Sequence, residues 1–329
     1  MNKFITVCFL AIFFCAGVHA QAFIIERGST VVSFGTITEA IAALQDGDVF
    51  YIPPGVHGSG TMSITKRVNM IGAGYAGGGA SVINGTVQFS ANGNNITGIR
   101  FAAMSLQGIS NTHFNRCMFT SDVSGTSNTS SMSGILFTEC EFRSTFGSGY
   151  TPRGVVASKC IFKGQIIVRE STIYNSIIGL TGNNTFPTLN TDDNCVFQNN
   201  IFISSMVNTT TEFYMYNVRN TTFNNNLFVG GVPNYSQATD CTFTPDNIVE
   251  ELYSNVFTDP AAEDYTLKAV CRGKNAGTDG KDMGLFGTSV PFKESRLPAI
   301  PYFSLKNIGT EVNEAGNLPV KFVVEAQER

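Results

Sequence analysis

Aromatic and polar residues alternate in a short motif that returns along the middle of the chain. The motif has an aromatic residue at each end and a cysteine or asparagine at its fourth position, as in FNRCMF (114–119), FTECEF (137–142), FQNNIF (197–202) and FNNNLF (223–228). Looser copies are ITGIRF (96–101), ASKCIF (157–162) and LYSNVF (252–257), whereas IYNSIIG (173–179) fits poorly. The copies begin about every 20 residues, and their alternation predicts short strands joined by tight polar turns. Period and pattern together favour a parallel β-helix.

Equivalent positions of such a coil stack at the spacing of neighbouring strands, about 4.8 Å. The last motif position predicts an inward aromatic column of Phe119, Phe142, Phe162, Phe202, Phe228 and Phe257. The fourth position predicts a column at a turn, made of Cys117, Cys140, Cys160, Asn200, Asn226 and Asn255. Stacked asparagines can hydrogen-bond along the axis, and a small cysteine fits the same slot. The three cysteines are therefore interpreted mainly as buried core residues rather than as nucleophiles, metal ligands or disulfide partners.

Both ends of the predicted coil have a candidate cover. Thr36 and Glu39 form a capping box before an Ala/Ile/Leu-rich helix, which can close the first turn. The last residues contain prolines and one alternating strand at 320–324, and they are predicted to form a tail that runs along the coil or caps it. The position after the Cys/Asn column is apolar but should point outward, with Glu141 as the exception: Met118, Ile161, Ile201, Leu227 and Val256. This outer stripe needs the tail or a partner subunit as a cover.

Two stretches near the start of the coil, GDVFYIPPGVH (47–57) and ITKRVNMIGAG (64–74), resemble the pectin-lyase-like right-handed parallel β-helix superfamily. DPAAEDYTLKAVCRGKNAGTDGKDMGLFG (259–287) looks like the closing segment of exported bacterial β-helix proteins. The resemblance implies an all-β, single-stranded right-handed β-helix, and it implies a fold more than an activity. The expected organisation is a signal peptide at 1–20, a helix-capped β-helix at 21–287 and a C-terminal tail at 288–329.

The first 20 residues have a lysine near the start, a short apolar run and the small-x-small ending Val18-His19-Ala20, which is typical of a secretory signal. We therefore expect a secreted, periplasmic or cell-surface protein, and we expect no transmembrane segment, because no later run is long and apolar enough. Only 14% of the residues are charged, which favours a β-rich chain. The net charge of -4 gives no electrostatic footprint for nucleic acid.

Charged residues offer two chemical designs on the outer face. A hydrolase needs paired carboxylates, and the only adjacent pair in the coil, Asp192-Asp193, also reads as an Asx-rich turn; the pair is the candidate site for Ca²⁺. Arg143 and Lys163 follow the inward phenylalanine on successive turns and should stack, with Glu141 close by. In the resembling superfamily, lyases use Lys or Arg to take a proton beside a uronate carboxylate, often with Ca²⁺. The alternative is that these basic residues only keep strand ends soluble.

Sugar binding without catalysis has its own candidate. In EFYMYNVR (212–219), alternation places Tyr214 and Tyr216 on one face, with Arg219 following, and two such rings form a flat amphipathic platform for a sugar. The alternative is that the rings pack beneath a loop or the tail. We expect an exported β-helix protein that binds a polysaccharide or a cell-surface partner through its outer face without catalysis. Two other hypotheses stay open: a polysaccharide lyase that acts on a uronate-containing glycan by β-elimination, and a structural adhesin-like module. Whichever holds, the apolar outer stripe could also support an oligomer.

Overall fold

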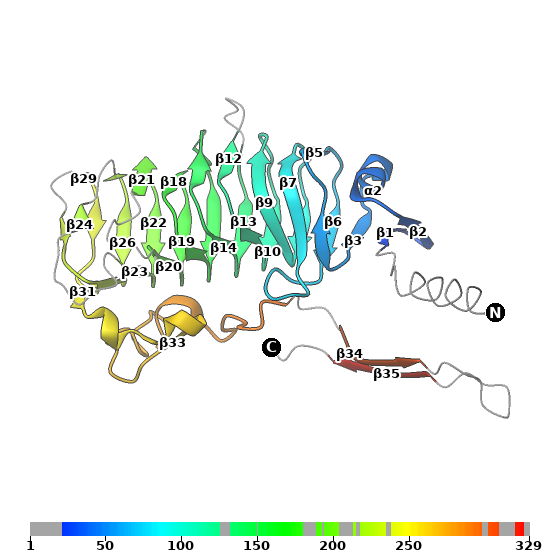
Figure 1. Cartoon of the computed structure of the whole chain (residues 1–329). Coiled ribbons are helices and arrows are strands. Elements are labelled where there is room, and N and C mark those ends of the chain that lie inside the picture. The colour runs from blue at the N-terminus through cyan, green and yellow to red at the C-terminus, as the bar shows by residue number, and fades with distance from the viewer. Residues whose placement is uncertain are drawn as a thin grey trace, which may run out of the picture.

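The chain forms an elongated coil of stacked β-strands (Figure 1). The computed structural model describes residues 22–125, 132–149, 151–179, 189–192, 194–203, 213–214, 218–234, 238–297, 302–308 and 320–325. Within these ranges α2 (Ile37–Ala43) is the one α-helix, and most other elements are short strands. The structure confirms the parallel β-helix predicted from the repeated motif.

One face of the coil is a twelve-stranded sheet. Its parallel strands follow one another turn by turn: β3 (Val49–Ile52), β6 (Asn69–Gly72), β8 (Asn95–Thr97), β10 (His113–Asn115), β13 (Ile135–Thr138), β16 (Val155–Ser158), β19 (Thr172–Tyr174), β22 (Val196–Gln198), β26 (Thr222–Asn224) and β30 (Thr242–Phe243). At the N-terminal end, β1 (Phe23–Arg27) and β2 (Thr30–Phe34) extend this sheet in antiparallel pairing.

The rest of each turn belongs to a second, longer set of parallel strands. These are β4 (Gly55–His57), β5 (Thr61–Ile64), β7 (Ser81–Phe89), β9 (Ile99–Leu106), β11 (Met118–Phe119), β12 (Val123–Gly125), β14 (Glu141–Phe142), β15 (Phe146–Ser148), β17 (Ile161–Phe162), β18 (Ile166–Arg169), β20 (Ile177–Ile178), β21 (Leu189–Asp192), β23 (Ile201–Ile203), β25 (Val218–Arg219), β27 (Leu227–Val229), β29 (Ala238–Thr239) and β31 (Ile248–Glu251). A separate pair joins β24 (Phe213–Tyr214) to β28 (Pro233–Asn234).

The predicted inward aromatic column is present, with two changes of membership. Stacked rings run from Phe119 through Phe142 to Phe162, with centroids 4.9 Å and 4.7 Å apart. Ile178, in the copy that fits the motif poorly, continues the column to Phe202. The prediction for Phe257 is wrong, because this residue leaves the coil and begins β32 (Phe257–Asp259).

The column at the turn is also confirmed, and it continues through residues that the motif did not align. Asn200 accepts from the backbone of Ser176, and Asn226 and Asn247 repeat this bond on the next two turns, at 2.8–2.9 Å. The assignment of Asn255 is wrong, since it lies in the 3₁₀ turn η1 (Tyr253–Asn255) beyond the last rung. Cys117, Cys140 and Cys160 are buried and not in disulfides, as expected for core residues.

The N-terminal end is closed by α2 (Figure 1). Thr36 caps the helix by accepting from the Glu39 backbone at 3.2 Å, as the capping box predicts. The helix buries Ile37 and Ala40 toward the first strands. A bidentate pair between Arg27 and Asp48, at 2.8 and 2.7 Å, ties β1 to the turn after the helix.

Residues 253–297, named the cover segment here, return along the outside of the coil (Figure 1). The segment contains η1, β32, η2 (Pro260–Ala262), β33 (Asp264–Leu267) and η3 (Gly284–Phe286). It packs on the predicted outer stripe, burying Ile161, Ile201 and Leu227 in one apolar cluster. Ile177 belongs to the stripe as well. Val256 does not, because it is part of the cover segment and Ile248 takes its place in register with Leu227.

The predicted domain boundary at residue 287 falls inside the cover segment. Beyond it, β34 (Tyr302–Ile308) and β35 (Val320–Glu325) form an antiparallel hairpin, and the second strand contains the alternating run 320–324. In the part of the chain that the structure describes, no helix is long and apolar enough to cross a membrane.

Candidate functional site

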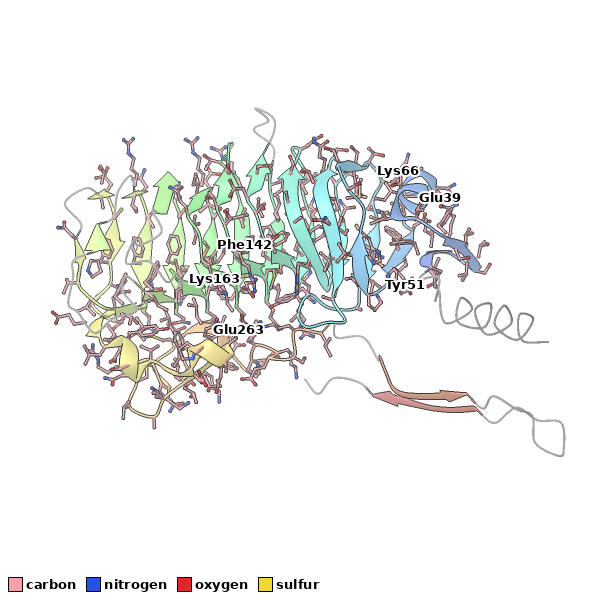
Figure 2. All side chains as sticks on the ribbon, viewed as in Figure 1. Glu39, Tyr51, Lys66, Phe142, Lys163 and Glu263 are labelled. Carbon is pink, nitrogen blue, oxygen red and sulfur yellow. The ribbon has the colours of Figure 1, made fainter. Side chains whose placement is uncertain are left out.

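The three residues proposed for lyase chemistry lie together on the coil. Glu141 on β14 points outward, and its Oε1 accepts from Arg143 Nε at 2.8 Å and pairs with Lys163 Nζ at 2.9 Å. The contact arises because β14 and β17 are paired in register, which brings Lys163 of the next turn beside Arg143. Figure 2 shows Lys163 on the side of the coil that faces the cover segment.

The central carboxylate of this group is buried. The Glu141 side chain is 1% exposed, against 23% for Lys163 and 41% for Arg143. Burial alone would raise the pKa of Glu141, but the nearby charges of Lys163 and Arg143 outweigh it and hold the pKa below its ordinary value. Glu141 is therefore an ionised group that is matched by two cations rather than a carboxyl poised to give up a proton.

The cover segment completes the cluster with residues that the sequence pattern did not suggest. Arg296 lies 3.9 Å from Glu141 Oε2 and forms a short ion pair with Glu263, and Glu263 in turn lies 4.0 Å from Arg143. The Arg296 guanidinium also sits over the ring of Tyr75, which is fully buried, at 5.9 Å. Burial raises the pKa of Tyr75, so its hydroxyl stays neutral.

This arrangement restricts what the cluster can do chemically. A lysine that donates to a carboxylate cannot at the same moment accept a proton from a substrate, so Lys163 acts as a base only after it separates from Glu141. The cluster pairs three cations, Arg143, Lys163 and Arg296, with two carboxylates, Glu141 and Glu263, and it joins two distant parts of the chain. The geometry is that of an ionic cluster that fastens the cover segment.

The structure describes the remaining predicted site residues only in part. Tyr214 lies on β24, but its side chain and the whole of Tyr216 fall outside the described residues, whereas Arg219 is exposed at the end of β25. Asp192 ends β21 in register with Arg169, and Asp193 lies outside the described residues. Among the residues that the structure does describe, no three His, Cys, Asp or Glu side chains gather as a metal site. The prediction of Ca²⁺ at Asp192 and Asp193 stays a prediction.

A second candidate surface is the outer side of the twelve-stranded sheet, which the sequence analysis did not single out. Two side-chain columns point outward from its parallel strands. The first column is Val49, Asn69, Asn95, His113, Leu136, Val156, Thr172, Val196, Thr222 and Thr242, and the second is Tyr51, Ile71, Thr97, Asn115, Thr138, Ser158, Tyr174, Gln198 and Asn224.

These two columns contain no Asp, Glu, Lys or Arg, although the structure describes every residue in them. Their one titratable imidazole, His113, bonds to Thr138 Oγ1 at 3.0 Å, and burial lowers its pKa, so it is neutral near pH 7. Most of the side chains are half-buried or exposed, and Ser158 is buried. The signal was present in the sequence: in every copy from 96–101 to 223–228, the residues on either side of the first motif position are neutral, as in HFN (113–115) and TFN (222–224).

No protein-family model and no curated protein sequence matches the chain. Among solved structures it is similar to ORF18 of Geobacillus virus E2, with 15% identity and a TM-score of 0.35 over 66% of this chain and 57% of that one. It is also similar to a mannuronic acid specific polysaccharide family 6 lyase from human gut microbiota, with 11% identity and a TM-score of 0.32 over 65% and 63% of the two chains.

A third similar structure is a mutant of the PL6 family alginate lyase AlyGC, with 8% identity and a TM-score of 0.31 over 79% of this chain and 57% of that one. The chain thus spans less than two thirds of the length of each of these proteins. At such scores the likeness says nothing about what this chain binds or does. The site must be interpreted from its own residues.

Proposed function

We propose that this protein is exported and binds an extended neutral polysaccharide along the outer side of its twelve-stranded sheet, without catalysis. The observation that carries the proposal is the uncharged pair of outward columns, which repeats with every turn of the coil. Ten strands spaced about 4.8 Å apart span about 43 Å, which suits a long chain better than a small molecule. The proposed location is the cell surface or the space outside the inner membrane, as the N-terminal sequence predicts.

The chemistry of the columns supports a sugar ligand. Hydroxyl and amide side chains such as Thr138 and Gln198 can exchange hydrogen bonds with sugar hydroxyls. Tyr174 adds an aromatic ring with a polar tip in the second column, next to Gln198 on the following turn. An anionic glycan would gain no ion pair on this surface, since neither column has a cation.

Affinity electrophoresis of the full chain against neutral and uronate-containing polysaccharides tests the proposal. We expect binding to at least one neutral polysaccharide, and we expect Tyr174→Ala combined with Gln198→Ala to weaken it about tenfold or more. Ser63→Ala, an exposed position on β5, is the matched control and should leave binding unchanged. Binding that is weakened only by Tyr214→Ala and Tyr216→Ala would move the site to the tyrosine platform.

A polysaccharide lyase is the second candidate function, and one observation favours it: Arg143, Lys163 and Glu141 do meet on the surface of the coil. The test is to follow the ultraviolet absorbance of unsaturated product with uronate-containing polysaccharides, with and without Ca²⁺. A rise in absorbance that Lys163→Ala or Arg143→Ala abolishes would establish a lyase and displace the binding proposal. No rise with any substrate would count against elimination chemistry.

A further inference from the structure

On successive turns of the coil, the residue directly before the column at the turn has a left-handed backbone. The members of that column here are Cys117, Cys140, Cys160, Ser176, Asn200 and Asn226. The φ of the left-handed residue lies between 49° and 54° on six successive turns, at Arg116, Glu139, Lys159, Asn175, Asn199 and Asn225. All six are at most 8% exposed, because the cover segment lies across them. The chemistry of this left-handed column changes halfway: the first three side chains are charged, and the last three are asparagines, which adopt this conformation more readily than most other residues with a side chain.

The asparagine half holds residues 276–287 of the cover segment with neutral bonds. Asn225 donates to the Ala276 carbonyl at 2.8 Å, and Asn199 exchanges two bonds with Thr278, at 2.9 and 3.2 Å. The same stretch of the cover segment buries Met283 and Leu285 on the apolar stripe, each 1% exposed. This half is attached by ordinary apolar packing and amide hydrogen bonds.

The charged half holds residues 288–297, and it does so through their main chain. Lys159 Nζ donates to the Val290 carbonyl in a short bond, and Glu139 Oε2 accepts from the Lys293 amide at 3.2 Å. Arg116 Nη1 donates to the Leu297 carbonyl at 2.7 Å while its Nε pairs with Glu139 at 2.8 Å. Three charged side chains from three successive turns therefore hold this irregular run at three points.

The contact of this run with the coil leaves polar atoms unpaired. Arg296 Nε, Glu141 Oε2 and Tyr75 Oη are buried without a hydrogen-bond partner, which disfavours the docked state. Opening would return the first two to water. Phe292 is the one residue of 288–297 that joins the apolar cluster, whereas Val290 is 49% exposed.

We infer that residues 288–297 form a releasable strap, which opens as a unit from the charged column while residues 276–287 stay docked. Opening uncovers Arg116, Glu139 and Lys159 and takes Arg296 away from Glu141, so it creates a charged surface that the closed molecule hides. The hairpin of β34 and β35 follows the strap in the chain, so a partner that pulls on the hairpin would act directly on it. This inference does not depend on the proposed glycan binding.

Hydrogen exchange of the full chain, followed by mass spectrometry, tests the strap. In the unmodified protein we expect amides of 290–297 to exchange about tenfold faster or more than those of 276–287, and this comparison needs no variant. Lys159→Met and Glu139→Gln each remove one charged side chain that is hydrogen-bonded to the main chain of the strap. Each should speed exchange in 290–297 about tenfold further. Exchange in 276–287 and in the coil peptide 155–178 should not change.

Two matched variants complete the design. Asn225→Gln should loosen 276–278 and leave 290–297 unchanged, and Arg153→Met, which breaks an exposed ion pair with Glu170, should affect neither half. The inference is overturned if the two halves of the cover segment exchange at the same rate and respond together to Lys159→Met. It is equally overturned if Lys159→Met and Glu139→Gln leave exchange in 290–297 unchanged.

Discussion

Glu141 shows that a residue's position in the coil can be predicted from sequence while the contacts that bury it cannot. Its position beside Arg143 and Lys163 followed from the motif register, but its burial depends on Arg296 and Glu263, which lie more than a hundred residues further along the chain. No local pattern connects SRLP (295–298) to the coil. Pairwise contacts inside a repeat can be predicted because the repeat fixes them, whereas contacts with a non-repeating segment cannot.

Removing the charge of Glu141 leaves Lys163 without this partner and Arg143 with only the more distant Glu263. We expect Glu141→Gln to lower the free energy of unfolding by somewhat less than the roughly 3–5 kcal/mol typical of a fully buried pair, because Arg143 and Lys163 still reach water. Glu170→Gln is the control, since Glu170 and Arg153 are both 42% exposed and should contribute at most about 1 kcal/mol. Urea unfolding measures both, and equal losses would contradict the buried role of Glu141.

The same carboxylate predicts a dependence on pH. The groups that face it are Arg143 and Lys163 on the coil and Arg296 and Glu263 on the cover segment, together with the buried ring of Tyr75. Since the pKa of Glu141 is lower in the folded protein than its ordinary 4.5, its contribution is complete above that value and is lost as the pH falls through the lowered folded pKa. The difference in urea midpoint between the unmodified chain and Glu141→Gln should therefore shrink on acidification below about pH 4. A constant difference would show that the lowered pKa does not contribute.

At the scale of elements, the register of the coil was predictable for turns that keep the motif and failed where the chain leaves it. LYSNVF (252–257) matches the motif at its asparagine and its last phenylalanine, but it contains a 3₁₀ turn. The last turn of the coil passes instead through Thr242–Phe243 and Ile248–Glu251. Conversely, IYNSIIG (173–179) lacks the aromatic ends and the Cys or Asn of the motif. Ser176 nevertheless lies in the column at the turn, and Ile178 lies in the inward aromatic column. A stacking slot selects for size and hydrogen bonding, so serine can replace asparagine and isoleucine can replace phenylalanine.

The asparagine ladder gives an element-scale prediction. Asn226 is fully buried; its Oδ1 accepts from the Asn200 amide at 2.9 Å, and its Nδ2 donates to the Phe197 carbonyl at 2.9 Å. Asn226→Ala leaves the Asn200 amide unpaired inside the coil and takes one bond from the Phe197 carbonyl, so we expect a loss of about 1–3 kcal/mol in unfolding free energy. Asn115→Ala, which changes an outward asparagine, should cost less than about 1 kcal/mol. Chemical denaturation distinguishes the two, and a small loss for Asn226→Ala would mean that water replaces the ladder bonds.

At the scale of the whole molecule, the cover segment packs along the outside of the coil and buries its apolar stripe. The sequence predicted that something must cover the outer stripe, because an outward row of isoleucine and leucine is unstable in water. It assigned the cover to the tail at 288–329 or to a partner subunit, whereas the anchors Met283 and Leu285 lie before that tail, in a turn-rich stretch without periodicity. The cover is set by the shape of the finished coil rather than by a pattern of its own.

Loss of this cover should change the assembly state of the protein. Leu285 is 1% exposed within the cluster that contains Ile177, Ile201 and Leu227, so Leu285→Asp would bury an unpaired carboxylate in an apolar seam, at a cost of several kcal/mol. We expect the cover to undock and the bared stripe to drive self-association, seen as a larger species by size-exclusion chromatography with light scattering. Val290→Asp, at a position that is 49% exposed, should leave the oligomeric state unchanged. If Leu285→Asp keeps the size of the unmodified protein and binds no more hydrophobic dye, then the stripe does not need its cover, and the apolar anchoring argued here for residues 276–287 is wrong.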